Sequence, residues 1–323
     1  MANLQTQNRF SSQSPQTLIE SIIKAARPIH WVKNLAIFAA LVFSHTLYEK
    51  SLFKEVFWAF ISFNFATSAT YIFNDIVDAK LDRLHPTKKN RPIASGKLSI
   101  PMAFLTIAIL TLISLLIARS LSLLFFFMVI VYFVSQGLYS LFLKNLAIID
   151  ILLIAAGFII RVYAGAFIID AHLSVWFLLC VISVALFLAS GKRRSELGVL
   201  ASTEGETRKS LSKYSKPLLD SFVTMFGNAA WLSWALFTFF ESPQATLPVW
   251  LFLAEISRTT TINKLLMATI PVVIFGIMRY ESLIFEDRSE APEKVLLTDK
   301  SLITSAVIWL IMVVWILYGG ITL

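Results

Sequence analysis

Five stretches of this sequence are long, apolar and almost free of charge, and they decide what the chain can fold into. They span residues 55–73, 102–118, 121–143, 173–190 and 301–323. A helix crosses the hydrocarbon core of a bilayer in about 20 residues, and these stretches approach or exceed that length. Of the 323 residues, 57% are hydrophobic and only 15% are charged, against about 25% charged in soluble domains. The sequence therefore predicts an all-α, polytopic membrane protein.

We predict nine transmembrane helices arranged around a central cavity. They span residues 35–49, 53–76, 100–118, 121–143, 146–169, 173–190, 217–240, 260–278 and 301–321. Cytoplasmic segments of membrane proteins carry an excess of Lys and Arg. With the N-terminal segment inside, the inside segments hold 22 of the 28 Lys and Arg residues, the outside segments hold five, and Arg161 lies within the membrane. This asymmetry predicts a multi-pass protein of the inner (plasma) membrane with its N-terminus inside and its C-terminus outside.

The polar residues at the start of the chain differ from everything that follows. They lack the basic start, short apolar core and small-residue cleavage site of a signal peptide. We therefore expect residues 1–26 to form a disordered cytoplasmic tail and residues 27–323 to form a single transmembrane catalytic domain. The only cysteine, Cys180, cannot form an intrachain disulfide, and no Gly-rich nucleotide loop is present. We expect no nucleic-acid partner, and a homo-oligomer is compatible with the sequence.

Residues 71–96, YIFNDIVDAKLDRLHPTKKNRPIASG, place three aspartates where an apolar helix meets a basic loop. On a helix Asn74, Asp78 and Asp82 lie four residues apart and share a face, with Asp75 beside them. One alternative is a solvated loop whose aspartates pair with neighbouring cations: Lys80, Arg83, Lys88, Lys89 and Arg91. Clustered carboxylates that repel each other at a membrane boundary instead favour Mg²⁺, a hard cation that binds oxygen ligands and completes its shell with water and substrate phosphates.

Two motifs carry a resemblance to a known family. NDIVDAKLDR at residues 74–83 resembles the first aspartate-rich motif of the UbiA-type intramembrane prenyltransferases, and YSLFLK at residues 139–144 resembles their Tyr-Ser-x-x-Leu-Lys segment. The resemblance implies nine helices around a cavity in which Mg²⁺ bridges the aspartates to a diphosphate. It also implies that Lys144 grips phosphate and that Tyr139 lies close by.

The sequence departs from the aromatic prenyltransferases after the sixth predicted helix. Their second Asp-x-x-x-Asp motif is replaced here by GKRRSEL at residues 191–197, which has three basic residues and only Glu196 as an acid. Arg and Lys bind phosphate oxygens directly, so one acidic and one basic cluster suit a substrate with a diphosphate and a further phosphate. This pattern is similar to that of the decaprenyl-phosphate phosphoribosyltransferases. Supporting segments are RPIHWVKN at 27–34, DRLHPTKKNRPIASG at 82–96, GFIIRVYAG at 157–165 and APEKVLL at 291–297.

That resemblance implies a reaction and a set of site residues. The 5-phosphoribosyl group of 5-phosphoribosyl 1-diphosphate passes to a polyprenyl phosphate, diphosphate leaves, and the product serves arabinan and cell-envelope glycan synthesis. Asp75, Asp78 and Asp82 would be the catalytic residues and would hold the metal together with Asn74. Lys192 and Arg193 would bind the donor's 5-phosphate, and Glu196 would bind a sugar hydroxyl or orient the basic pair. We expect Lys33, Asn34 and Lys144 to line the inner mouth; orientation in the membrane or lipid contact remains an alternative for each lysine. The other predicted substrate-binding residues are Asn74, Arg83, Lys88, Arg91, Tyr139 and Arg161.

Asp150 and Arg161 are ionisable residues inside one predicted helix. They lie eleven residues apart on one face, about 16 Å by helical rise, which is too far for a direct pair. Because ionisable residues within a membrane usually face a cavity or pair with each other, we expect each to meet another helix. A purely structural role stays open for Arg161.

Two other functions remain compatible with the sequence. One is Mg²⁺-dependent transfer of a prenyl group to an aromatic or other small acceptor, against which the missing second aspartate motif argues. The other is transport or lipid binding, but transporters often contain paired halves with helices broken at the midplane. In this chain the aspartates cluster at one membrane boundary.

Overall fold

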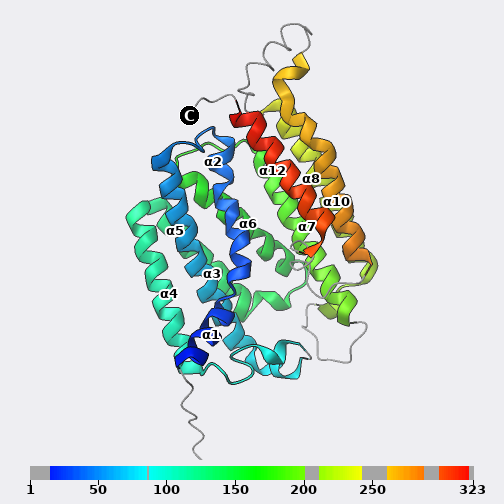
Figure 1. Ribbon diagram of the computed structural model, residues 1–323. Coiled ribbons are helices and arrows are strands. Elements are labelled where there is room, and N and C mark those ends of the chain that lie inside the picture. The colour runs from blue at the N-terminus through cyan, green and yellow to red at the C-terminus, as the bar shows by residue number, and fades with distance from the viewer. Residues whose placement is uncertain (1–14, 86, 201–210, 242–259, 287–297, 320–323) are drawn as a thin grey trace, which may run out of the picture.

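The computed structural model describes residues 15–85, 87–200, 211–241, 260–286 and 298–319, and within them every regular element is helical (Figure 1). The longer helices are α1 (Pro15–Ala26), η1 (Pro28–Phe38), α2 (Ala39–Phe43), α3 (Lys50–Leu84), α4 (Ile100–Leu121), α5 (Leu123–Leu141), α6 (Ile149–Ile168), α7 (Val175–Leu200), α8 (Lys216–Phe240), η5 (Thr260–Thr269), α10 (Ile270–Phe285) and α12 (Lys300–Tyr318). Single 3₁₀ turns are η2 (Lys88–Asn90), η3 (Leu143–Asn145) and η4 (Leu211–Lys213).

Eight helices in the described part of the chain are long and apolar enough to cross a membrane. The ninth predicted span corresponds to the shorter apolar segment Pro28–Phe43, which is mostly 3₁₀ helix and begins seven residues earlier than predicted. The all-α membrane fold is thus confirmed. The expected central cavity stays a prediction.

The segment expected to be disordered is partly helical. Residues 15–26 form α1, whose apolar Leu18, Ile22 and Ala25 recur at helical spacing and pack against Ile72 and Ala79 of α3. Burial of this stripe stabilises the helix against the rest of the protein, so the prediction of disorder is wrong for these residues. Residues 1–14 lie outside the described part of the chain.

Two helices continue well past their predicted ends. α3 has 35 residues, about 52 Å at ~1.5 Å per residue, and so exceeds a hydrocarbon core of about 30 Å. Its last turns therefore carry the aspartates beyond the apolar run. α7 likewise runs to Leu200, so the segment 191–197 is helical and not the loop that we predicted.

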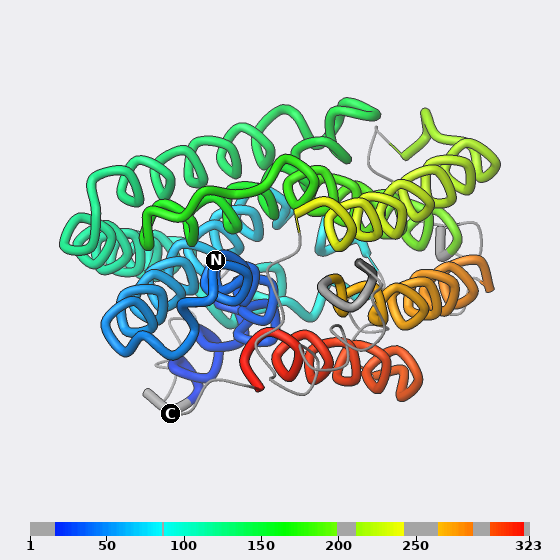
Figure 2. Tube along the Cα trace, turned by 90° about the horizontal axis from the view of Figure 1, so that it is seen from above, coloured from blue at the N-terminus to red at the C-terminus, as the bar shows by residue number. Residues whose placement is uncertain are grey.

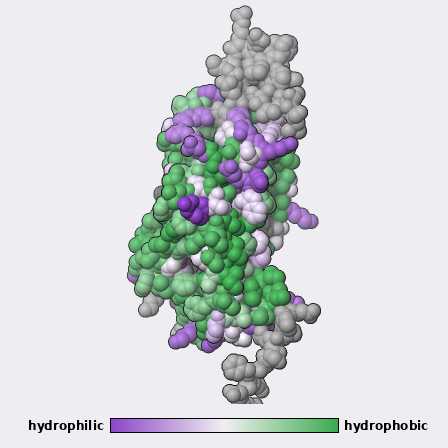
Figure 3. Space-filling model, turned by 90° about the vertical axis from the view of Figure 1, so that its left-hand side faces the viewer, coloured by the Kyte–Doolittle hydropathy of each residue, from purple (hydrophilic) through white to green (hydrophobic). Residues whose placement is uncertain are grey.

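Consecutive helices from α3 to α12 follow one another around the molecule, as the view from above makes clear (Figure 2). The last helix, α12, contacts the first part of the chain again, because the Tyr318 hydroxyl donates to Val42 O in α2 (2.7 Å). The outer helices α4 and α5 expose apolar side chains such as Leu112 and Val134. Figure 3 accordingly shows apolar residues over most of this side, with hydrophilic residues in its upper part and at its lower edge.

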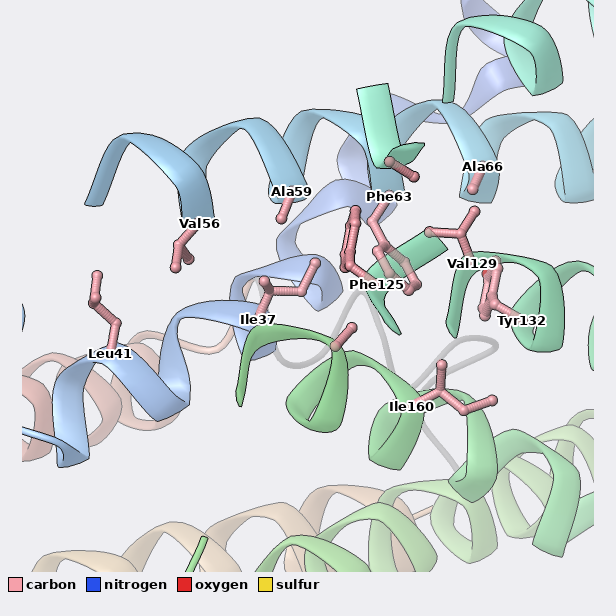
Figure 4. Packing of buried hydrophobic residues seen from close by; sticks show 12 residues of the cluster. Ile37, Leu41, Val56, Ala59, Phe63, Ala66, Phe125, Val129, Tyr132 and Ile160 are labelled. Carbon is pink, nitrogen blue, oxygen red and sulfur yellow. The ribbon is translucent and has the colours of Figure 1, made fainter. Parts of the chain in front are cut away.

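α3 and α6 are the most buried spans. Their shared core with η1, α2 and α5 is close-packed, with Phe63, Phe125 and Ile37 pointing toward one another from three elements (Figure 4). This packing fixes the two helices that carry the ionisable residues singled out in the sequence.

Candidate active site

The three aspartates of the motif lie on one face at the end of α3, and all are buried. Arg27 Nη2 approaches Asp75 Oδ1 to 2.5 Å. Arg91 Nη1 bridges two carboxylates, at 3.1 Å from Asp75 Oδ1 and 2.6 Å from Asp82 Oδ2. Lys144 Nζ pairs with the remaining carboxylate, that of Asp78. The solvated-loop alternative is therefore wrong about exposure, although Arg91 is one of the partners that it named.

The three cations reach this cluster from separate segments. Arg27 stands between α1 and η1 with a left-handed backbone (φ 53°) and its guanidinium 5.1 Å from the centre of the Tyr71 ring. Arg91 follows η2, and Lys144, itself buried, lies in η3 directly after α5. Arg27 was missing from our predicted site residues. Its position at the start of RPIHWVKN was the only signal in the sequence.

The cluster has the chemistry to hold a hard divalent cation. Asn74 Oδ1 and Asp75 Oδ2 are buried and accept no hydrogen bond in the structure, while Asn74 Nδ2 donates to Asp78 Oδ2 (3.1 Å). Amide and carboxylate oxygens are the ligands that Mg²⁺ prefers. Among the described residues no three or more His, Cys, Asp or Glu side chains converge as a ready metal site, and the carboxylates instead face basic side chains. The residues thus fit Mg²⁺, but their present geometry would have to change to bind it.

A second charged network surrounds Arg193, which is fully buried in α7. Its Nη1 donates to Glu196 Oε2 (2.5 Å) and its Nη2 to Tyr139 Oη (2.8 Å). Its Nε lies 2.6 Å from Asp150 Oδ2. The structure thus brings together three predicted site residues and joins them to α6 through Asp150. All three guanidinium nitrogens face protein partners, so direct binding of a donor phosphate by Arg193 stays a prediction and would require rearrangement.

Arg161 and Asn34 lie deeper, in a buried cluster of neutral groups. Arg161 Nε donates to Asn34 Oδ1 (2.5 Å), and its Nη2 donates to the Tyr132 hydroxyl (3.1 Å). Asn34 Nδ2 in turn donates to Asn64 Oδ1 (2.7 Å) and Thr67 Oγ1 (3.2 Å). Asn34 is fully buried and therefore does not line an exposed mouth as we expected.

The prediction that Asp150 and Arg161 each meet another helix is confirmed. Asp150 pairs with α7 through Arg193, and Arg161 bonds to η1 and α5 through Asn34 and Tyr132. No carboxylate pairs with Arg161 within the described ranges. It is held by oxygen dipoles and by the rings of Tyr132 and Phe158, whose centres lie 5.1 and 5.6 Å away.

The remaining predicted residues are Arg83, Lys33, Lys88 and Lys192. Arg83 is exposed, and its Nε donates to Ala94 O (3.2 Å), which braces the segment after α3. Lys33, Lys88 and Lys192 are half-buried. Their roles toward a substrate stay predictions.

Comparison with known proteins adds the last observation. The UbiA prenyltransferase family matches residues 35–296. The decaprenyl-phosphate phosphoribosyltransferase of Corynebacterium glutamicum is 33% identical over 313 residues, which cover 95% of this chain and 89% of the relative. The protein of the same name from Mycolicibacterium smegmatis is 37% identical over 229 residues, covering 70% and 72%. A solved UbiA homolog from Archaeoglobus fulgidus bound to GPP and Mg²⁺ has a TM-score of 0.62 at 15% identity, covers 94% of this chain and 100% of that one, and thus shares the fold.

Proposed function

Because this chain belongs to the UbiA prenyltransferase family, we propose that it is a phosphoribosyltransferase that acts on 5-phosphoribosyl 1-diphosphate and a polyprenyl phosphate. The identity to decaprenyl-phosphate phosphoribosyltransferases along most of the chain carries this proposal. The basic segment around Arg193 supports it, because a prenyl diphosphate has no further phosphate to bind. The lipid product would feed arabinose-donor and cell-envelope glycan synthesis.

The acidic cluster would bind the donor's diphosphate with the help of a divalent metal ion. Asn74, Asp75, Asp78 and Asp82 would hold Mg²⁺, with the two unpaired oxygens of Asn74 and Asp75 as its first ligands. When bound, Mg²⁺ supplies a Lewis acid that offsets the charge of the leaving diphosphate. Arg27, Arg91 and Lys144 already lie against the carboxylates. They can exchange these oxygens for phosphate oxygens, which form charge-assisted hydrogen bonds of the same kind.

The reaction needs little further chemistry from the chain. The bond between the anomeric carbon and the diphosphate oxygen breaks, and diphosphate leaves with the electron pair. An oxygen of the acceptor phosphate forms the new bond to that carbon. The acceptor is already an anion at neutral pH, so no strong general base is required, and positioning with electrostatic stabilisation can supply the catalysis.

The second network orients the sugar end of the donor. Lys192 is our candidate for the 5-phosphate, and Glu196 is our candidate for a ribose hydroxyl. Arg193 holds Glu196 and Tyr139 in place. It can contribute to phosphate binding directly only if its present partners are exchanged.

The soluble donor should enter from the cytoplasm, because the segments assigned inside hold 22 Lys and Arg and those assigned outside hold five. Ser212 in η4 and Ser120 near the end of α4 are both exposed and lie in segments assigned to opposite sides. With Cys180 replaced by serine, an impermeant thiol reagent added to intact cells should label Ser120→Cys and not Ser212→Cys. The reverse pattern would invert the proposed topology.

Mass spectrometry of the reaction products tests the function itself. Purified protein with 5-phosphoribosyl 1-diphosphate, Mg²⁺ and a short polyprenyl phosphate should yield a lipid heavier by one phosphoribosyl group. Parallel reactions should contain a prenyl diphosphate with an aromatic acceptor. A prenylated product there, together with no phosphoribosyl lipid, would assign the protein to the other transfer reaction.

A further inference from the structure

Tyr214 is a buried tyrosine that lies just after η4 and outside every predicted site. Its hydroxyl donates to Asp150 Oδ1 (2.6 Å) and accepts a hydrogen bond from Ile148 N (2.5 Å). Burial, and the hydrogen bond to Asp150, raise the pKa of Tyr214. The hydroxyl thus stays protonated at neutral pH and remains a donor.

The backbone at Ile148 explains why such a contact is needed. Ile148 has φ 71° and ψ −49°, a positive-φ conformation that is rare and strained, especially for β-branched residues. Its side chain is about half exposed, so packing does not hold it there. The hydrogen bond from its N–H to Tyr214 therefore helps to fix a strained turn between η3 and α6.

This turn joins the two charged networks. Four residues before Ile148, Lys144 pairs with Asp78 of the acidic cluster. Two residues after Ile148, Asp150 is fully buried; one carboxylate oxygen accepts the hydrogen bond from Tyr214, and the other forms an ion pair with Arg193.

We propose that Tyr214 and Asp150 are positioning residues that set the turn between α5 and α6, and with it the placement of Lys144 and of the pair Arg193–Glu196. This inference rests on the proposed function for its effect on the donor. The contacts themselves do not depend on that function.

The structure offers a matched control for removing the Tyr214 hydroxyl. The Tyr318 hydroxyl also accepts from a backbone N–H, that of Leu47 (3.4 Å), and donates to an oxygen, that of Val42 (2.7 Å). Tyr318 is likewise buried, but it is the last residue of α12 and contacts Val42 and Leu47 instead of the turn before α6. Tyr214→Phe and Tyr318→Phe therefore delete the same kind of contact at two places.

Hydrogen exchange tests the contact without any reaction. In Tyr214→Phe the amides of residues 143–151 should exchange at least tenfold faster than in wild type, whereas Tyr318→Phe should leave them unchanged. Equal protection of this segment in all three proteins would overturn the proposal, because the turn would then not depend on Tyr214.

Steady-state kinetics tests the positioning. Tyr214→Phe should raise KM for 5-phosphoribosyl 1-diphosphate about five- to twentyfold, the range expected for losing one or two hydrogen bonds, with KM for the polyprenyl phosphate within about twofold. When Ile148→Gly is added to Tyr214→Phe, KM for the donor should fall part of the way back to the wild-type value, since glycine adopts this backbone without strain. A faster-exchanging turn with unchanged donor KM, or no recovery by Ile148→Gly, would overturn the positioning role. Inactive wild-type protein would instead reject the proposed function.

Discussion

Two buried polar clusters lie along α3, and they balance charge in opposite ways. The acidic cluster at the helix end sets three carboxylates against three basic side chains. About 12 Å deeper by helical rise, near Thr67, Arg161 is one cation held by neutral oxygens and aromatic rings. Desolvating a second charge is costly, so in the membrane interior amide and hydroxyl dipoles replace a carboxylate partner.

The difference indicates which cluster can change partners. The side chains of Arg27 and Arg91 keep 20% and 23% of their surface exposed, so water or a phosphate can reach them. Arg161 is only 5% exposed, and its three nitrogens are bonded to Asn34, Gly157 and Tyr132. We infer that the basic side chains of the acidic cluster can exchange their carboxylate partners for other ligands. Arg161 keeps its partners Asn34, Gly157 and Tyr132, and we call this group of residues the anchor.

The largest effect is expected in the acidic cluster. Asp78→Asn removes a charge from the proposed metal site, so turnover should fall at least about 10³-fold, as expected for several kcal/mol of lost Lewis-acid stabilisation. The melting temperature should also fall, because the buried Lys144 ammonium loses its carboxylate partner. EDTA should reproduce the loss of turnover in the wild-type protein. Added Mg²⁺ should restore turnover in the EDTA-treated wild type and not in Asp78→Asn. Full activity of the Asp75→Asn, Asp78→Asn double variant would remove the metal assignment.

Substitutions in the anchor should lower the stability of the fold. Arg161→Met deletes the hydrogen bonds that Arg161 donates to oxygens of Asn34, Gly157 and Tyr132, and hydrogen bonds to a charged group contribute about 1.5–3 kcal/mol each. We expect a net loss of about 2–4 kcal/mol, visible as a lower melting temperature in detergent. Arg27→Met should cost less than this, because Asp75 keeps Arg91 as a partner and Arg27 itself retains 20% of its side-chain surface exposed. Equal losses in the two variants would contradict the comparison.

If the basic side chains can leave the carboxylates, each of them competes with the metal ion for the same carboxylate oxygens. Arg91→Gln should raise the affinity for Mn²⁺ about five- to tenfold in the absence of donor, measured by electron paramagnetic resonance, because Asp75 and Asp82 lose a competing cation. The same change should weaken donor binding. Lys89→Gln, an exposed neighbour, is the matched control and should alter neither. A lower Mn²⁺ affinity in Arg91→Gln would mean that Arg91 supports the ion instead.

The smallest effect is expected for alanine substitutions at two glycines, one of which lies against Arg161. An alanine Cβ at Gly157 would lie 3.3 Å from Arg161 Nη1 and 3.5 Å from Gln136 Nε2. At Gly137 in α5 a Cβ would meet nothing within 4 Å, so Gly137→Ala should gain up to about 1 kcal/mol from helix propensity. In Gly157→Ala the contacts of the new Cβ should cancel this gain, and the free energy of unfolding should fall by up to about 1 kcal/mol. Similar melting temperatures for the two variants would show that Arg161 has room to move.

Sequence reasoning succeeded where the signal was local. Apolar runs predicted the spans, and the four-residue spacing of Asn74, Asp78 and Asp82 predicted their shared face. The true length of α3 was also readable, because no Gly or Pro occurs between residues 53 and 84 and Pro86 follows directly. We ended the helix too early because we equated the end of apolarity with the end of the helix, and the same error hid the helical segment 191–197.

Tertiary partners could not be predicted in this way. Arg27 is 48 residues from Asp75 in sequence, and Tyr214 is 64 from Asp150. No periodicity links such pairs, and only the fold brings them together. Arg193 shows the same limit: its type suggested a phosphate ligand, whereas its burial among three partners follows from how α6 and α7 pack.

The length of α3 makes this protein sensitive to the thickness of its membrane. From the charged residues Lys54 and Glu55, a hydrocarbon core of about 30 Å covers some 20 residues and ends at about Asp75. The aspartates therefore stand where the phosphate of a membrane-embedded lipid meets water. A thicker bilayer would draw them toward the acyl chains and a thinner one would lift them away, and hydrophobic mismatch of this kind costs fractions of a kcal/mol per Å. With the proposed substrates, the bilayer would thus act as a spacer that aligns a lipid with a soluble donor.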